Sequence, residues 1–373
     1  MVDGTFPHCT SWWLCSRPQW ILWLPVPKSH SSEKTQFLIQ KLSVFLCVSI
    51  TTEIFSIKTE TDFNTAALSV FRHQAEHCEV YKAYIGNLRI LPQDITVVAD
   101  IPFLPISFFK THEVLSKKVV PEIVFSSSGT TGQIQSKHLV TNVSVYEQSF
   151  NTAFEIFYSK PEDTCILALL PSYLERDGSS LIYMVDSLLS QSKHPDSGYF
   201  LHNHADLYEK LVELQKTGIK TLLIGVTYAL LDFTEVYQID FPELIVMETG
   251  GMKGKRKEMV REELHAQLTA GFGVSMIHSE YGMTELLSQA YSDGAGIFRC
   301  PPWMKILLRD TNDPLSPPQN NQTGGINVID LANINSCAFI ATQDLGKVYQ
   351  DGSFEVLGRF DNSDIRGCNL LVQ

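Results

Sequence analysis

Short apolar runs alternate with longer amphipathic stretches along the chain beyond residue 60. Between Asp62 and Tyr84, apolar side chains recur near the helical period of 3.6 residues, which predicts one helix with Asp62 as its cap. Five apolar runs are typical of strands: Glu122–Phe125, Thr164–Leu170, Thr221–Val226, Leu244–Glu248 and Val274–His278. Four stretches predict further helices: Ser144–Tyr158, Ser179–Ser190, Ala205–Lys216 and Lys257–Ala270. This alternation predicts an α/β fold with a mainly parallel sheet covered on both faces.

The pattern changes beyond residue 300, where turns rather than helices separate the apolar runs. Four runs are typical of strands: Trp303–Arg309, Gly325–Asp330, Cys337–Thr342 and Ser353–Leu357. We therefore expect an α/β body over 51–300 and a small β-rich subdomain over 301–373.

Residues 1–50 differ in composition from the rest of the chain. They contain four of the five tryptophans and three of the eight cysteines, and they carry a net charge of +2 against −14 for the remainder. Their apolar stretches are too short for a membrane span. The order of charged and apolar residues does not fit a secretory signal, which begins with basic residues. We interpret 1–50 as an atypical N-terminal extension that is not part of the catalytic fold.

The overall charge of −12 argues against a protein that binds nucleic acids or anionic membranes through a cationic face. The eight cysteines contain no CxxC pair, so neither a disulfide framework nor a zinc site is indicated. Cys165, Cys300 and Cys337 lie within or beside predicted strands and are expected in the core. These features are typical of a reduced cytoplasmic protein.

A loop of small residues directly follows the predicted strand that ends at Phe125. It reads Ser126-Ser127-Ser128-Gly129-Thr130-Thr131-Gly132. Small residues allow backbone N–H groups to converge on an anion, and the hydroxyls add donors. The loop lacks the Gly-Lys-Ser/Thr ending of a P-loop, so a GTPase or kinase site is not indicated. A phosphate cradle is the stronger interpretation, and a solvated Ser/Gly loop is the alternative.

A second motif ends the strand predicted at Val274–His278. It reads Ser279-Glu280-Tyr281-Gly282-Met283-Thr284-Glu285. Open α/β sheets bind ligands at such strand ends, and this motif supplies an aromatic ring, a hydroxyl and a carboxylate suited to Mg²⁺. A simple Tyr-Gly turn with a capping threonine is the alternative.

Three further motifs follow in order: Gly250-Gly251-Met252, Thr342-Gln343-Asp344-Leu345-Gly346 and Gly358-Arg359-Phe360-Asp361. Together with the first two, they resemble the adenylate-forming (ANL-like) enzymes, the superfamily of acyl- and aryl-CoA ligases. The resemblance runs from about residue 100 to the end of the sequence. It implies a large adenylation domain that uses ATP and Mg²⁺.

The resemblance also implies a role for each matching residue. Ser128, Gly129, Thr130, Thr131 and Gly132 would hold the triphosphate of ATP. Gly250 and Gly251 would lie against adenine, and Tyr281 would stack on it. Thr284 would contact the α-phosphate, Glu285 would hold Mg²⁺, Asp344 would bind the ribose hydroxyls, and Arg359 would reach the nucleotide from a hinge.

Two differences from the usual pattern of these enzymes narrow the resemblance to one group within the superfamily. Four residues, Gln133 to Ser136, separate the small-residue loop from Lys137, where a Pro-Lys pair usually follows at once. The sequence ends twelve residues after Asp361, so we expect it to lack the mobile lid domain of the usual ligases. What remains is similar to the LuxE-type acyl-protein synthetases, which activate fatty acids and carry the acyl group on a cysteine near the C-terminus. Cys368 matches that position.

The sequence therefore predicts an AMP-forming acid–thiol ligase. It would convert a carboxylic acid, expected to be a fatty acid, to an acyl-adenylate and then to a thioester on Cys368, for delivery to an acyl reductase or another acceptor protein. An acyl- or aryl-CoA ligase with coenzyme A as the acceptor is the first alternative. A nucleotide- or acyl-binding partner without turnover is the second.

Overall fold

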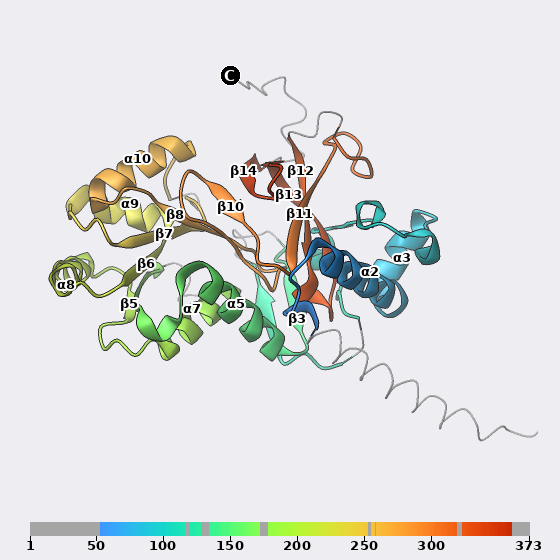
Figure 1. Cartoon of the computed structure of the whole chain (residues 1–373), viewed down its shortest axis with the longest axis horizontal. Coiled ribbons are helices and arrows are strands. Elements are labelled where there is room, and N and C mark those ends of the chain that lie inside the picture. The colour runs from blue at the N-terminus through green and yellow to red at the C-terminus, as the bar shows by residue number, and fades with distance from the viewer. Residues whose placement is uncertain are drawn as a thin grey trace, which may run out of the picture. The chain divides into compact units, whose positions relative to one another are not determined.

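The computed structural model describes residues 53–116, 119–127, 134–171, 178–252, 255–257, 259–318 and 323–359 (Figure 1). The predicted extension 1–50, the loop residues Ser128 to Gly132 and the tail with Cys368 lie outside the described residues. All described residues belong to one unit, Cys47–Gln373.

The described chain alternates helices and strands as far as α10 and then continues as strands. Its α-helices are α2 (Glu60–His77), α3 (Glu79–Asn87), α4 (Phe108–Thr111), α5 (Val143–Tyr158), α7 (Ser180–Gln191), α8 (His204–Thr217), α9 (Thr227–Val236) and α10 (Arg261–Phe272). Its short 3-10 helices are η1 (Pro92–Asp94), η2 (Val98–Asp100), η3 (Pro161–Asp163) and η4 (Leu331–Asn333).

The strands form one large sheet and one separate hairpin. The early strands are β1 (Leu104–Pro105), β2 (Ile123–Ser126), β3 (Lys137–Val140), β4 (Cys165–Leu169), β5 (Gly198–Phe200), β6 (Thr221–Val226) and β7 (Ile245–Thr249). The later strands are β8 (His278–Tyr281), β9 (Ala290–Ser292), β10 (Ile297–Arg299), β11 (Met304–Arg309), β12 (Gly324–Asp330), β13 (Phe339–Val348) and β14 (Phe354–Arg359). Strands β2 and β3 pair only with each other among the described residues.

The large sheet is mixed, with the strand order β11-β12-β13-β14-β10-β9-β8-β7-β6-β4-β5 and β1 beside β13. The ladders that join β8, β7, β6, β4 and β5 are parallel, whereas those that join β8, β9, β10, β14, β13, β12 and β11 are antiparallel. The predicted α/β fold is confirmed, and the parallel part corresponds to the alternating half of the sequence. Strand β14 also pairs with β10, which joins the C-terminal strands to the α/β half in a continuous sheet.

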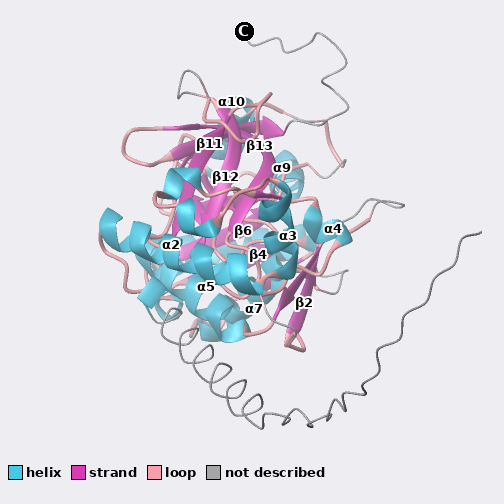
Figure 2. Ribbon diagram, turned by 90° about the vertical axis from the view of Figure 1, so that its right-hand side faces the viewer, coloured by secondary structure: helices cyan, strands magenta, loops and turns pink. Residues whose placement is uncertain are grey.

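Helices cover both faces of the parallel part. Figure 1 shows α9 and α10 on one side of β6 to β8, and α5 and α7 on the other. At the β-rich end, Figure 2 shows β11, β12 and β13 side by side. Helices α2 and α3 pack there through Phe71 and Tyr81, whose rings both contact Phe339 of β13. Burial of these large side chains on both faces is the main source of stability.

The helix predicted over Asp62–Tyr84 is wrong in one respect, because the chain forms two helices there. The backbone of Cys78 is extended between α2 and α3, which turns the chain so that Phe71 and Tyr81 both reach Phe339. The helix cap also differs. Thr59 is the N-cap, and Asp62 completes a capping box by accepting a hydrogen bond from the backbone N–H of Thr59.

Two other differences have simple physical causes. Helix α9 was not predicted, because most of its residues are apolar and buried, which leaves no polar face to reveal a helical period. The strand predicted over Val274–His278 begins only at His278, where pairing with Met247 of β7 starts. No helix among the described residues is long and apolar enough to cross a lipid bilayer.

Candidate adenylation site

The described site residues that the motifs predict lie on strands of the large sheet or in the turns that follow them. Parallel strands β7 and β8 end at Thr249 and Tyr281, and the antiparallel strands β13 and β14 bring Asp344 opposite Arg359. The Thr249 hydroxyl donates a 2.6 Å hydrogen bond to Glu280, which ties the ends of β7 and β8 together. The sheet therefore assembles residues that are up to 110 positions apart in the sequence.

The Gly250-Gly251 turn requires two consecutive glycines. Both residues have positive φ angles, +79° and +70°, in the left-handed region that side chains with a Cβ disfavour. Thr227, at the start of α9, supports the turn. Its hydroxyl accepts a 3.2 Å hydrogen bond from the Gly251 backbone and donates a 2.9 Å bond to Glu248. The turn consequently presents bare, exposed backbone beside the end of β8.

Tyr281 and Asp344 are joined directly. The tyrosine hydroxyl donates a 2.8 Å hydrogen bond to Oδ2 of Asp344, and Nε of Arg359 lies 3.7 Å from Oδ1 of the same carboxylate. Burial raises the pKa of Asp344, whereas its hydrogen bond from Tyr281 and the positive charge of Arg359 oppose that shift. Arg359 is the exposed member of the group, with 69% of its side chain accessible to solvent.

The Tyr281 ring is buried against two other aromatic rings. Its centroid lies 5.9 Å from that of Phe298 and 5.5 Å from that of Phe354, both in edge-to-face geometry. Burial raises the pKa of its hydroxyl well above the ordinary value, so Tyr281 is a neutral hydrogen-bond donor at neutral pH. These contacts hold the tyrosine in one orientation at the end of β8.

Thr284 and Glu285 lie in the turn between β8 and β9. The Glu285 side chain is only 6% exposed, and burial raises its pKa. Four influences oppose that shift in pKa: the Ser136 side chain, the backbone N–H of Glu285 itself, and the positive charges of Arg359 and Lys110. A carboxylate that is buried in this way is stabilised by a nearby cation.

Glu285 fits a Mg²⁺ site of the type that the substrate completes. A carboxylate with a neighbouring hydroxyl offers the oxygen ligands that Mg²⁺ prefers. Among the described residues, no group of three or more His, Cys, Asp or Glu side chains could hold a metal ion without other ligands. Magnesium commonly binds one or two carboxylates together with substrate phosphates, so a single buried glutamate is sufficient.

The two ends of the small-residue loop lie close to this turn. The Ser127 N–H donates to the Ser136 carbonyl at 3.0 Å, and the Ser136 N–H donates to the Ser127 hydroxyl at 2.9 Å. The β2–β3 hairpin therefore closes just before Ser128, and it brings Ser136 to Glu285. The loop residues Ser128 to Gly132 themselves lie outside the described residues.

Sequence reasoning missed the side chains that hold the Thr284–Glu285 turn. Asn333 donates a 2.7 Å hydrogen bond to the Glu285 carbonyl, and Asp330 accepts one of 2.7 Å from the Leu287 N–H. His138 contacts the Thr284 carbonyl at 2.9 Å. These residues precede the turn by 146 positions or follow it by at least 43, and none belongs to a local motif. The sequence offers one indirect indication of such a role, because His138 follows Gly132 of the small-residue loop by six residues.

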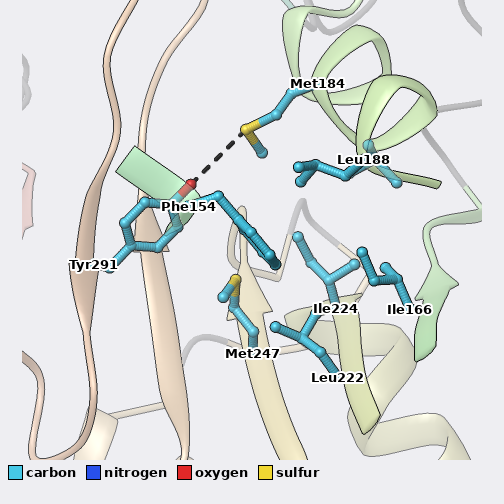
Figure 3. A pocket seen from close by; sticks show the side chains of 9 residues that line it. Phe154, Ile166, Met184, Leu188, Leu222, Ile224, Met247 and Tyr291 are labelled. Atoms are coloured by element: carbon cyan, nitrogen blue, oxygen red, sulfur yellow. Dashed lines mark hydrogen bonds between the residues drawn. The ribbon is translucent and has the colours of Figure 1, made fainter. Parts of the chain in front are cut away.

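A small apolar cavity of about 10 Å³ lies between α5, α7 and the parallel strands (Figure 3). The hydroxyl of Tyr291 approaches it and contacts Sδ of Met184 at 3.9 Å. The cavity volume is at the lower limit for one water molecule. Met184 and Met247 form part of its wall, and methionine side chains adapt their shape readily. Figure 3 shows Phe154, Ile166, Met184, Leu188, Ile224 and Met247 around it.

The described cysteines are poor nucleophiles. Cys165 and Cys337 are buried as predicted, and burial raises the pKa of Cys165 to about 11. Burial also raises the pKa of Cys337, Cys78 and the partly buried Cys300. Because the thiolate is the reactive form, none of these four is suited to accept an acyl group at neutral pH.

Comparison with known protein families gives one match that covers most of the chain. The family described as "Acyl-protein synthetase, LuxE" matches residues 52–373. Among curated proteins, the long-chain-fatty-acid–luciferin-component ligase of Photorhabdus luminescens is 39% identical over 66 residues, or 17% of this chain. That match spans 56% of the relative's length.

Solved structures with a similar fold include adenylate-forming ligases. A 2-hydroxyisobutyryl-CoA ligase in complex with its acyl-adenylate has a TM-score of 0.59 at 11% identity, covering 82% of this chain and 69% of that one. ATP-bound MatB from Rhodopseudomonas palustris has a TM-score of 0.47 at 16% identity, over 66% of this chain and 48% of that one. At these identities, the first comparison establishes the fold alone.

Proposed function

Because the chain belongs to the LuxE family of acyl-protein synthetases, we propose that it is an ATP- and Mg²⁺-dependent ligase that activates a fatty acid as its acyl-adenylate. The name of the curated relative, a long-chain-fatty-acid ligase, supports a fatty acid as the substrate. The observation that carries the proposal is the group formed by Tyr281, Asp344 and Arg359 beside the buried carboxylate of Glu285.

In this proposal, the nucleotide lies across the carboxyl ends of β7 and β8. Adenine would lie between the backbone of the Gly250-Gly251 turn and the side chain of Tyr281. Asp344 would accept hydrogen bonds from the ribose hydroxyls. The exposed Arg359 can turn from Asp344 toward the phosphates, because solvent surrounds most of its side chain. Ser128, Gly129, Thr130, Thr131 and Gly132 would cradle the β- and γ-phosphates through their N–H groups and hydroxyls.

The first reaction joins the acid to AMP. A carboxylate oxygen of the fatty acid attacks the α-phosphorus, the bond from that phosphorus to the bridging oxygen breaks, and pyrophosphate leaves. The Thr284 hydroxyl would donate a hydrogen bond to an α-phosphate oxygen, and Glu285 would hold Mg²⁺, which supplies positive charge to neutralise the phosphates. The protein contributes mainly by positioning, because both reactants are already chemically competent.

The apolar cavity under α7 is a candidate site for the far end of the acyl chain. Ile224 and Met247 lie two residues before the ends of β6 and β7, so the cavity is about 7 Å beneath the edge that carries the Gly250-Gly251 turn. The cavity must widen to accept an alkyl chain. Rotation of the Met184 and Met247 side chains would provide the room, because methionine adapts its shape at low cost.

The second reaction transfers the acyl group to Cys368. The thiolate attacks the carbonyl carbon of the acyl-adenylate, the bond from that carbon to the phosphate oxygen breaks, and AMP leaves. The four described cysteines are disfavoured as acceptors by their raised pKa values, whereas Arg366 is two residues from Cys368 and would stabilise its thiolate. An acyl reductase or another carrier would then receive the acyl group.

Intact-mass measurement after incubation with ATP, Mg²⁺ and a mixture of carboxylic acids tests the proposal. We expect one acyl adduct that hydroxylamine removes, that Cys368→Ser abolishes and that the control Cys300→Ser retains. Cys368→Ser should still exchange pyrophosphate into ATP. Absence of exchange with every acid would refute the adenylation, whereas acyl-CoA formed on addition of coenzyme A, without a protein adduct, would refute Cys368 as the acceptor.

A further inference from the structure

His138 connects the hairpin that carries the small-residue loop to the turn that carries Thr284 and Glu285. It lies on β3, two residues after the loop closes at Ser136, and its side chain is 1% exposed. Its Nδ1 lies 2.9 Å from the carbonyl oxygen of Thr284. We propose that His138 is a positioning residue, which fixes Thr284 and Glu285 relative to the β2–β3 hairpin by donating its Nδ1–H to the Thr284 carbonyl.

The chemistry of the contact determines the tautomer. A carbonyl oxygen only accepts hydrogen bonds, so Nδ1 must carry the proton. Burial lowers the pKa of His138 to about 4, and the ring is therefore neutral near pH 7. A neutral ring carries one proton, so Nε2 is unprotonated. The less common Nδ1–H tautomer is thus a specific expectation for this histidine.

The contact supplies a restraint that the other anchors of the turn do not. Asn333 of η4 holds Glu285, and Asp330 at the end of β12 holds Leu287. Both anchors fix the turn to the large sheet. Among the described residues, the bond from His138 ties the turn's backbone to β3, which lies in the separate two-stranded sheet.

His138 is fixed to the two strands that lead into and out of the small-residue loop. Phe125 and His138 are partners in the β2–β3 ladder, and the paired Ser127 and Ser136 lie two steps further along it. The imidazole also packs edge-on against Phe109 of α4, with ring centroids 5.7 Å apart. A side chain held on both sides in this way has one orientation, so a shift of the hairpin changes the position of Thr284.

This inference rests on the proposed adenylation, in which the loop holds the leaving pyrophosphate and Thr284 contacts the α-phosphate. Both groups must be aligned with the α-phosphorus at the same time. Loss of the bond from His138 should therefore reduce kcat for pyrophosphate exchange more than it raises KM for the acid, because alignment matters most in the transition state.

Paired substitutions separate positioning from simple packing. Asparagine at position 138 places an amide N–H near the location of Nδ1, whereas glutamine places its amide near Nε2. We expect His138→Asn to retain kcat within about threefold and His138→Gln to lose at least tenfold, which is the loss typical of misplaced reacting groups. His77→Asn is the matched control, because Nδ1 of His77 also contacts a backbone carbonyl, that of His73, but in α2.

A spectroscopic measurement tests the inference without turnover. In wild-type protein at pH 7, ¹⁵N NMR of the imidazole should show a protonated Nδ1 and an unprotonated Nε2 for His138. An Nε2–H tautomer or a charged ring would overturn the proposal, as would equal loss of kcat in His138→Asn and His138→Gln with the same melting temperature. Failure of wild-type protein to exchange pyrophosphate would instead refute the proposed function and leave the NMR result intact.

Discussion

The hydroxyl of Tyr281 donates a 2.8 Å hydrogen bond to the carboxylate of Asp344, a residue 63 positions later in the chain. Tyr281 ends a strand of the parallel half of the sheet, and Asp344 lies on β13 in the antiparallel half. In the proposed complex, one residue faces adenine and the other binds ribose. This bond therefore holds the two halves of the nucleoside site in register.

We expect Tyr281→Phe to raise KM for ATP about fivefold with little change in kcat. The substitution keeps the ring contacts with Phe298 and Phe354 but removes the donor to Asp344, and an intramolecular hydrogen bond typically contributes about 0.5 to 1.5 kcal/mol. Pyrophosphate exchange at varied ATP concentration measures the change. Tyr199→Phe, which removes a comparable bond to Asp186 on α7, is the control and should leave KM unchanged.

We expect Glu285→Gln to lower pyrophosphate exchange at least about 100-fold and to shift the Mg²⁺ requirement to higher concentration. At pH 7 the same variant should be at least as stable as wild type in urea unfolding, because burial penalises the charged carboxylate and glutamine has nearly the same shape. Glu262→Gln, on the exposed side of α10, is the control. Normal activity in Glu285→Gln would remove this residue from the magnesium site.

The lowered pKa of His138 predicts how stability depends on pH. The unfolded chain binds this proton near pH 6.5 and the folded chain only near pH 4, so the contribution is complete above pH 6.5 and is lost as pH falls through 4. Relative to His138→Asn, wild type should lose about 2 to 3 kcal/mol of unfolding free energy between pH 7.5 and 4.5.

Urea unfolding of both proteins at several pH values measures this difference. Asp330, whose pKa burial raises to about 6, titrates in the same range in both proteins, and its contribution cancels from the comparison. A difference between the two proteins that does not change with pH would show that His138 is free to take up a proton in the folded state.

We expect Met184 to influence which acyl chains the enzyme activates. Met184→Ala should favour longer or bulkier acids, and Met184→Trp should favour shorter ones, because the side chain borders the apolar cavity under α7. Pyrophosphate exchange across acids of increasing length measures the preference. Leu231→Ala truncates a buried side chain of α9, on the other face of the sheet, and should change stability without changing this order.

Local sequence was sufficient for much of the fold and insufficient for the anchors of the site. Strand β6 lies where its apolar run predicts it, because a strand buried on both faces needs only a continuous run. Helix α9 and the start of β8 were missed, since burial on all sides hides the period of the first and pairing with Met247 decides the second.

In the candidate site, too, local sequence predicted some residues, whereas others depend on tertiary contacts. Motifs were sufficient to select Tyr281, Asp344 and Arg359, and the structure brings these three together. No motif could reveal that Asn333 and His138 hold the adjacent turn, because each does so through one bond to a backbone carbonyl far away in sequence. Contacts to backbone depend on tertiary structure and leave no preference for neighbouring residue types.

The pairing of β14 with both β13 and β10 has a consequence for biosynthesis. In the strand order, β14 is the link between the strands β11 to β13 and the strands β4 to β10, yet it is made after all of them. Folding on the ribosome can therefore complete each half of the sheet but cannot join them until Phe354–Arg359 has emerged. The same strand carries Arg359, so the nascent chain gains the joined sheet and this residue of the candidate site in one step.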